Sequence, residues 1–249
     1  MARIDAPIVA NQTLAAASAI FAWAIREDII KMNPCQKVER NETNERGRVV
    51  SDSEIPKFWE AFDSAGLVQS TALKMILLTG QRPGEVRHMR REHIVDGGWW
   101  QMPGSPDPKL GWPGTKNGES HRVWLSAPVR ALLTEMDGKG FVFAGPRGRE
   151  LDNSKLPKAM RDISRKLGVE AATPHDLRRT FSTRVRAIGF TRDDMNRLTN
   201  HKEGGIHNVY DQHGYSDENK KIMEAVASHI MSLVEGKPAD NVIAGKFSR

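Results

Sequence analysis

Residues 99–125 differ in character from the rest of the chain and limit its fold class. Residues 99–102 predict a strand, and residues 121–125 predict a second strand that returns beside it. Between them lie a proline- and glycine-rich excursion over residues 103–114 and then Asn117-Gly118, a pair typical of type I′ turns. Because helical patterns occupy both flanks, the fold class is mainly α with a small antiparallel β-sheet, an α+β arrangement.

Apolar residues at helical spacing predict the elements on both flanks. An amphipathic helix is expected over residues 12–31, ended by Asn33-Pro34, because the residue before proline disfavours the α region. Thr173-Pro174 predicts another helix start, with threonine as N-cap and proline in the first position. The other expected helices begin at Ser51, Thr71, Pro83 and Thr191 or span residues 127–136, 153–167 and 217–235.

Charge and capping signals suggest how the chain is organised. Residues 36–50 are charged and poor in large apolar groups, which is typical of a linker. Ser51 with Glu54 three positions later forms a capping-box pattern that opens the main domain. The expected organisation is a helical segment over residues 1–40, a linker over 41–50, a main domain over 51–235 and a C-terminal tail over 236–249.

Composition excludes several classes of protein. A hydrophobic share of 39% together with 21 glycines is ordinary for a globular chain of 249 residues. No uninterrupted apolar run approaches the roughly 18 residues of a membrane span, so we expect no membrane partner. The single cysteine, Cys35, permits no internal disulfide and suits a reducing compartment. The net charge of +6 is compatible with nucleic acid but locates no site.

One short segment could bind an anionic oxygen. His175 and Arg178 are three positions apart on one predicted helix and share a face turned away from Leu177 and Phe181. Both side chains can donate hydrogen bonds, and a guanidinium matches the geometry of phosphate. A solvated helix face is the structural alternative for this pair.

Three further positions are candidates with weaker individual signals. Arg82 follows a buried helix at a tight turn, and Glu85 can hold it by a salt bridge. Lys116 lies at the predicted hairpin tip, where a lysine usually serves only solubility. His201 follows a helix and precedes Tyr210 by nine positions. Each of these residues alone also has a purely structural explanation.

The order of these residues is more specific than any one of them. The strings LLTGQRPGEVRHMRREHI, GTKNGESHRVWLS, TPHDLRRTFSTRV and LTNHKEGGIHNVY follow one another along the chain. Together they resemble the tyrosine recombinases, the phage-integrase family of DNA strand-exchange enzymes, over about residues 51–235. NQTLAAASAIFAWAIREDIIKMNP is similar to the last helix of that family's core-binding domain. Residues 1–40 are therefore expected to be a remnant of that domain, in a fragment or truncated form of the protein.

The resemblance implies a transesterification at a DNA phosphodiester. A tyrosine oxygen attacks phosphorus, which leaves a 3′-phosphotyrosyl link and a free 5′-hydroxyl without metal, ATP or another cofactor. The implied roles are Tyr210 as nucleophile, Arg82, Arg178 and His201 as stabilisers of the phosphate oxygens, Lys116 as general acid, His175 as general base or proton shuttle and Glu85 as support for Arg82, with Arg82, Lys116 and Arg178 contacting DNA.

Two of these assignments have competitors within the chain. Lys109, in the long excursion before the hairpin tip, is an alternative to Lys116 as the general acid. Tyr215 is the other tyrosine of the chain, and we expect it to pack or position rather than to react. Tyr210 is preferred because it alone matches the family's distance from His201.

The resemblance also implies the biological setting. The expected partner is double-stranded DNA at an attachment or recombination site, bound by a tetramer in the cytoplasm of a bacterium, with the gene carried by a prophage or another mobile element. A type IB topoisomerase-like enzyme and a non-catalytic DNA-binding module are the alternatives. A metal hydrolase is disfavoured, because His201, His207 and His213 are six positions apart and would not share a helical face.

Overall fold

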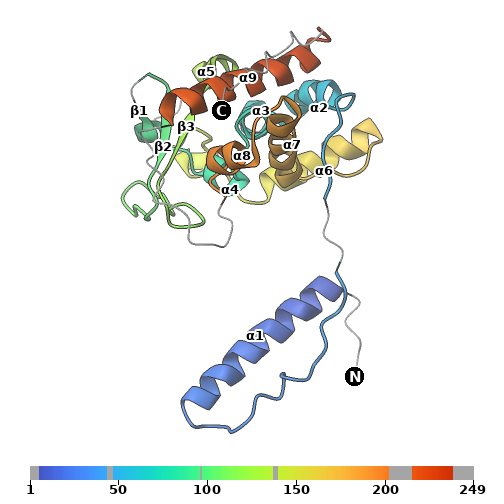
Figure 1. The fold of residues 1–249 in the computed structure, drawn as a ribbon, viewed down its shortest axis with the longest axis vertical. Coiled ribbons are helices and arrows are strands. Elements are labelled where there is room, and N and C mark those ends of the chain that lie inside the picture. The colour runs from blue at the N-terminus through green and yellow to red at the C-terminus, as the bar shows by residue number, and fades with distance from the viewer. Residues whose placement is uncertain (1–5, 44–46, 96, 137–139, 202–214, 238–249) are drawn as a thin grey trace, which may run out of the picture. The chain divides into compact units, whose positions relative to one another are not determined.

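The chain divides into two compact units, Met1–Gly47 and Arg48–Arg249. The computed structural model describes residues 6–43, 47–95, 97–136, 140–201 and 215–237 (Figure 1). The first unit holds α1 (Pro7–Arg26). The second holds α2 (Ile55–Phe62), α3 (Leu67–Thr79), α4 (Pro83–Arg87), β1 (Ile94–Val95), β2 (Trp99–Met102), β3 (His121–Trp124), α5 (Ala127–Thr134), α6 (Lys155–Leu167), α7 (Pro174–Ala187), α8 (Arg192–Leu198) and α9 (Ser216–Val234).

The helix of the first unit begins and ends about one turn earlier than the sequence predicts. Pro7 takes its first position, which suits a residue that lacks an N–H. Asp28 has a left-handed φ of 55°, so the α conformation stops before it. Asn33 therefore lies beyond the helix, where its Nδ2 donates to Ser18 Oγ at 3.0 Å and folds the return segment onto α1.

α1 is also the one helix of the described residues that could cross a membrane by length and composition. Its most apolar 18-residue window has a mean hydropathy of 1.5, and Ala24 is the one side chain of the helix that is buried. Core helices of soluble proteins and signal sequences have the same properties, so this helix alone assigns no membrane location.

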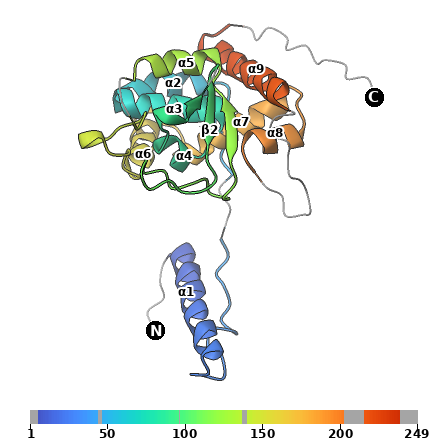
Figure 2. The ribbon, with the colours of Figure 1, turned by 90° about the vertical axis from the view of Figure 1, so that its left-hand side faces the viewer.

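α3 forms the centre of the second unit (Figures 1 and 2). It is buried over every residue from Ser70 to Thr79, not along one stripe as a surface helix would be. Helices α2, α5, α6, α7 and α9 pack around it. Even Lys74 is buried, and its ammonium reaches Asp63 at 2.6 Å. A helix enclosed in this way gives a fixed origin for the segment that follows it.

Gly80 ends α3 and joins it to α7. Its φ of 66° is left-handed, and a Cβ at this position would lie 2.1 Å from Cδ1 of Phe181. Only glycine fits both the backbone conformation and the space. Thr173 caps the start of α7 as predicted, because its Oγ1 accepts from the N–H of Asp176 at 3.3 Å and the Asp176 carboxylate accepts from its N–H at 2.8 Å.

A three-stranded antiparallel sheet in the order β1-β2-β3 lies at one side of the helices (Figure 1). The predicted hairpin is present, with Trp99 opposite Trp124 and Met102 opposite His121. β1 was not predicted, because a strand of two residues has too little periodicity to register in the sequence.

The proline- and glycine-rich excursion folds back on itself as a packed loop. Trp112 is buried, donates from Nε1 to the carbonyl of Pro103 at 2.8 Å and packs edge-on against His93. Gly104 and Gly114 cross closely, since a Cβ on Gly114 would lie 2.6 Å from the Gly104 carbonyl oxygen. The excursion is therefore closed at its base before the chain reaches Thr115.

The turn at the hairpin tip differs from the type I′ turn that Asn117-Gly118 predicts. The N–H of Gly118 donates to the carbonyl of Thr115 at 3.1 Å, so Lys116 and Asn117 are the central residues. Gly118 has a φ of 75°, whereas Asn117 is not among the described non-glycine residues of positive φ. The side chain of Asn117 bonds to Asn200, which is distant in the sequence.

Candidate active site

Arg178 is half-buried on α7 and is held at both ends of its guanidinium. Nη1 donates to the carbonyl of Gly80, and Nη2 donates to the carbonyl of Thr199, each at 2.7 Å. The end of α3 and the end of α8 therefore fix this group from two sides. Of the five N–H groups of an arginine, three are left for another acceptor.

Arg82 is held in the same manner from the other side. Nη1 forms the predicted ion pair with Glu85 Oε1 at 3.0 Å, and Nη2 donates to the carbonyl of Asn200 at 2.8 Å. The side chain of Glu85 is only 5% exposed, and its second oxygen accepts from the Arg82 N–H at 3.2 Å. The carboxylate thus fixes both the backbone and the guanidinium of Arg82.

The two arginines meet at the C-terminal end of α8. The last carbonyls of a helix lack partners within it and carry the negative end of its dipole, so they attract cations and donors. Here three successive carbonyls each accept from another segment. The carbonyl of Thr199 accepts from Arg178, and that of Asn200 accepts from Arg82. The carbonyl of Leu198 accepts from Gln81 Nε2 at 2.9 Å and from His121 Nε2 at 3.0 Å. Gln81 and His121 were not predicted as site residues.

The buried groups of this centre have shifted pKa values. Burial and the charge of Arg82 lower the pKa of Arg178 to about 10, although Glu85 opposes the shift, so the guanidinium stays charged at neutral pH. Burial lowers the pKa of His121 to about 4, and the positive charges of Arg178 and Arg82 act in the same direction. His121 is therefore neutral, with its proton on Nε2 facing the Leu198 carbonyl.

Lys116, His175 and His201 lie at the surface around the two arginines. Neighbouring protein atoms remove part of the hydration of His175 and lower its pKa, and the charges of Arg178, Arg179 and Lys116 lower it further. His175 is therefore a neutral base at pH 7. His201 lies three residues beyond the end of α8, and its N–H donates to the carbonyl of Asn196 at 2.9 Å.

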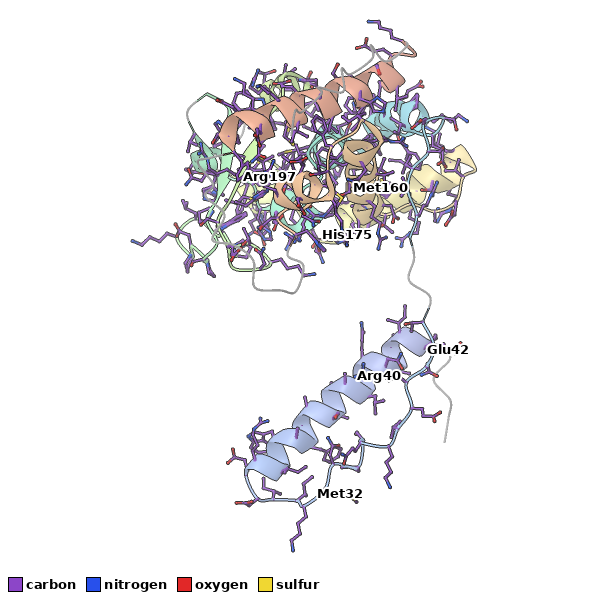
Figure 3. All side chains as sticks on the ribbon, viewed as in Figure 1. Met32, Arg40, Glu42, Met160, His175 and Arg197 are labelled. Carbon is purple, nitrogen blue, oxygen red and sulfur yellow. The ribbon has the colours of Figure 1, made fainter. Side chains whose placement is uncertain are left out.

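Two cavities flank His175, which lines both of them. The larger, of about 690 Å³, is also lined by Arg82, Glu85 and Lys116. The smaller, of about 460 Å³, is also lined by Arg178 and His201. The structure thus brings together every predicted site residue that it describes. Figure 3 labels His175 near the start of α7.

The competing residues are in different surroundings. Lys109 lies in the packed excursion, where its N–H donates to Asp107 Oδ1 at 3.0 Å. The ring of Tyr215 lies under the Arg197 guanidinium, 4.3 Å from its carbon, and Arg197 also donates to Asn219 Oδ1 at 2.7 Å (Figure 3 labels Arg197). Tyr215 therefore packs at the start of α9.

Part of the predicted chemistry falls in the segment 202–214. Tyr210, His207 and His213 lie there, outside the described residues. Within the residues that the structure does describe, no group of three or more His, Cys, Asp or Glu side chains could hold a metal ion.

Comparison with protein families identifies most of the second unit. The model of the phage integrase family matches residues 48–217. The prophage integrase IntZ of Escherichia coli (strain K12) is 29% identical over 229 residues, which cover 87% of this chain and 54% of IntZ. The chain therefore spans about half the length of this curated relative.

Solved structures share the fold at lower identity. A lambda integrase(75-356) dimer bound to a COC′ core site is similar with a TM-score of 0.65 and 18% identity, over 82% of this chain and 77% of that one. A lambda integrase tetramer bound to a Holliday junction gives a TM-score of 0.61 and 20% identity, over 79% and 57% of the two chains. These similarities confirm the predicted α+β fold class.

Proposed function

Because the chain belongs to the phage integrase family, we propose that it is a site-specific DNA recombinase that cleaves and rejoins strands through a 3′-phosphotyrosyl intermediate. The observation that carries the proposal is the pair of guanidinium groups held at the end of α8, with Lys116, His175 and His201 around them. This arrangement provides a place for one phosphate group with donors and proton-transfer groups on its sides.

Cleavage begins with Tyr210. A phenol with a pKa near 10 is almost wholly protonated at neutral pH, so the attack needs a base. His175 has a lowered pKa and is available to accept the proton. As the bond from the tyrosine oxygen to phosphorus forms, the bond to the 5′ oxygen breaks, and Lys116 gives its proton to that oxygen. Attack by a 5′-hydroxyl on the phosphotyrosine reverses the sequence and joins strands.

The two arginines stabilise the charge that gathers on the non-bridging oxygens in the transition state. Each preorganised donor of this kind typically contributes about 10²–10³ in rate. Their bonds to the carbonyls of Gly80, Thr199 and Asn200 hold them in position before DNA binds. His201, which lines the same cavity as Arg178, adds a further donor.

Lys116 is a better general acid than Lys109. It shares a cavity with Arg82 and His175, and its charge acts on the pKa of His175. Lys109 belongs to the packed excursion, whose chain closes at Gly104 and Gly114 before the tip. This placement favours Lys116 as the residue that protonates the leaving oxygen.

The domain assignment follows from the same proposal. Residues 51–235 form the catalytic domain, residues 41–50 the linker and residues 236–249 a tail, of which 238–249 lie outside the described residues. Residues 1–40, with α1, belong to a domain that binds the far side of the DNA. Residues 48–50 of this linker already pack against the second unit, which begins at Arg48, since the N–H of Val50 donates to Thr180 Oγ1 at 2.9 Å.

The partner is double-stranded DNA at an attachment site, and a tetramer performs the exchange. Support comes from the lambda integrase tetramer bound to a Holliday junction, which shares the fold. The similarity to a prophage integrase favours a gene on a prophage or other mobile element. A soluble protein that acts on DNA is the expected form, and the cytoplasm of a bacterial cell is the compartment that we propose.

Covalent trapping tests the proposal. With a nicked suicide DNA substrate, the wild-type chain is expected to form a covalent adduct that denaturing gels detect, and Tyr210→Phe is expected to abolish it. Tyr215→Phe is the matched control and should keep the adduct. An adduct that survives in Tyr210→Phe and disappears in Tyr215→Phe would contradict the assignment. Relaxation of supercoils without recombination between sites would instead indicate a topoisomerase.

A further inference from the structure

A pair of asparagine side chains joins the turn that carries Lys116 to the end of α8. Asn117 is the neighbour of Lys116, and Asn200 is the neighbour of His201. Asn117 Nδ2 donates to Asn200 Oδ1 at 2.8 Å, and Asn200 Nδ2 donates back to Asn117 Oδ1 at 3.1 Å. Two reciprocal bonds fix the relative orientation of two planar amides, which a single bond would not do.

Both partners are themselves held in place. Asn200 has a left-handed φ of 50°, a conformation that asparagine tolerates better than most residues, and its carbonyl accepts from Arg82. Asn117 Oδ1 also accepts from Thr115 Oγ1 at 3.1 Å, inside the turn. Thr115 is buried. The amide pair thus connects one anchored turn with another.

Lys116 depends on this connection because its own side chain is exposed. No hydrogen bond or ion pair within the described part of the chain holds its ammonium. The backbone of the turn therefore sets the point from which the Lys116 side chain extends. His121 anchors the base of the hairpin to the carbonyl of Leu198. Asn117 anchors its tip to Asn200, which lies two residues after Leu198.

We propose that Asn117 and Asn200 are positioning residues that set Lys116 against Arg82 for delivery of its proton to the leaving 5′ oxygen. This inference rests on the proposed function of Lys116 as general acid. It separates two tasks of the site, because the amide pair serves the leaving-group side while the arginines serve the phosphate oxygens.

The test compares two leaving groups on the same suicide substrate. One substrate has the natural 5′-bridging oxygen, and the other has sulfur in that position. A thiol is far more acidic than an alcohol, with a pKa near 8.5, so a thiolate leaves without a proton donor. Loss of proton delivery therefore slows adduct formation from the oxygen substrate and leaves the sulfur substrate fast, whereas loss of fold or of phosphate binding slows both.

The variants are Asn117→Ala and Asn200→Gly, because glycine removes the amide of Asn200 and still accepts the positive φ. With the oxygen substrate we expect adduct formation to fall roughly 10- to 100-fold, the scale of a misplaced proton donor. With the sulfur substrate we expect a fall of less than about 3-fold. The double variant should be no slower than the slower single variant, because both remove one interaction.

Two controls separate this inference from the proposed function. Lys116→Ala should show the same selective loss on oxygen, and Gln101→Ala, which removes an exposed amide from β2 of the same sheet, should match the wild type. If Lys116→Ala is not rescued by sulfur, the general-acid role itself is wrong and the inference falls with it. If Lys116→Ala is rescued but the asparagine variants are unchanged, or are slowed equally on both substrates, the inference alone is overturned.

A second measurement needs no catalysis. Hydrogen exchange of the chain without DNA should show faster exchange over residues 115–119 in Asn200→Gly than in the wild type, because the turn has lost its anchor. Unchanged protection of this segment would overturn the positioning role.

Discussion

The two arginines and the groups around them differ in how the protein holds them. Arg82 and Arg178 have both terminal nitrogens bonded to carbonyls or to a carboxylate, and the side chain of Arg82 is only 14% exposed. Lys116, His175 and His201 lie at the surface, and their positions follow from the backbone beneath them. The arginines form the floor of the site, and the other three residues form its rim.

The difference corresponds to two kinds of chemical work. A group that stabilises charge in a transition state contributes most when it is already oriented, because it then needs no reorganisation during the reaction. A group that transfers a proton must reach an atom that arrives with the DNA, and its pKa must stay near the working pH. The floor is therefore held rigid before DNA binds, whereas the rim is exposed.

The largest expected effect comes from loosening the floor. Arg178→Lys keeps the charge, but the ammonium cannot donate to the Gly80 and Thr199 carbonyls at the same time, because it lacks the planar fork of a guanidinium. We expect the rate of adduct formation on the suicide substrate to fall by about 10³, measured by single-turnover kinetics. A rate within 10-fold of the wild type would mean that charge alone suffices and that the floor need not be rigid.

A smaller effect is expected at acidic pH, where the buried histidine His121 lowers the free energy of unfolding. His121 has a pKa of about 4 in the folded chain, below the roughly 6.5 of an unfolded histidine. As the pH falls below 6.5, the unfolded chain takes up a proton first, so stability is lost down to about pH 4, on the order of 3 kcal/mol in all.

Urea unfolding at pH 7 and pH 4.5 measures this loss. His121→Gln keeps a donor for the Leu198 carbonyl and removes the titration, so its stability should fall less over the same interval. An equal pH dependence in wild type and variant would show that other groups carry the acid sensitivity.

The smallest effect concerns the rim. The charge of Arg179 is one of the causes that lower the pKa of His175, after reduced hydration and the charge of Arg178. Arg179→Gln should raise that pKa, so the acid limb of the pH–rate profile should move to higher pH. Lys166→Gln removes a charge from the exposed face of α6 and should leave the limb in place. Identical profiles for all three proteins would remove His175 as the titrating base.

Local signals made much of this site predictable. Thr173 with Asp176 predicted the start of α7, and the three-residue spacing of Arg82 and Glu85 predicted their ion pair; the structure contains both. Both depend on residues within one helical turn of each other, where side-chain geometry follows directly from sequence spacing.

The connections across the site could not be predicted in the same way. Gln81, His121 and Asn117 bond to residues 117, 77 and 83 positions away. Gln81 and His121 share one partner, the main-chain carbonyl of Leu198, and because every residue has a carbonyl this partner leaves no mark in the sequence. The prediction of a type I′ turn at Asn117-Gly118 is wrong, since Lys116 and Asn117 are the central residues, and the bond from Asn117 to Asn200 is a long-range one that local turn preferences do not include.

The convergence on the end of α8 also affects the order in which the molecule is made. Chains leave the ribosome from the N terminus, and the segments with Arg82, Lys116 and Arg178 emerge before residues 198–200. Until those three carbonyls are in place, both guanidinium groups lack an anchor that holds them in the finished protein. The site that we propose for DNA cleavage is therefore complete only when the domain is almost complete, because a chain interrupted before residue 198 lacks one anchor of each guanidinium.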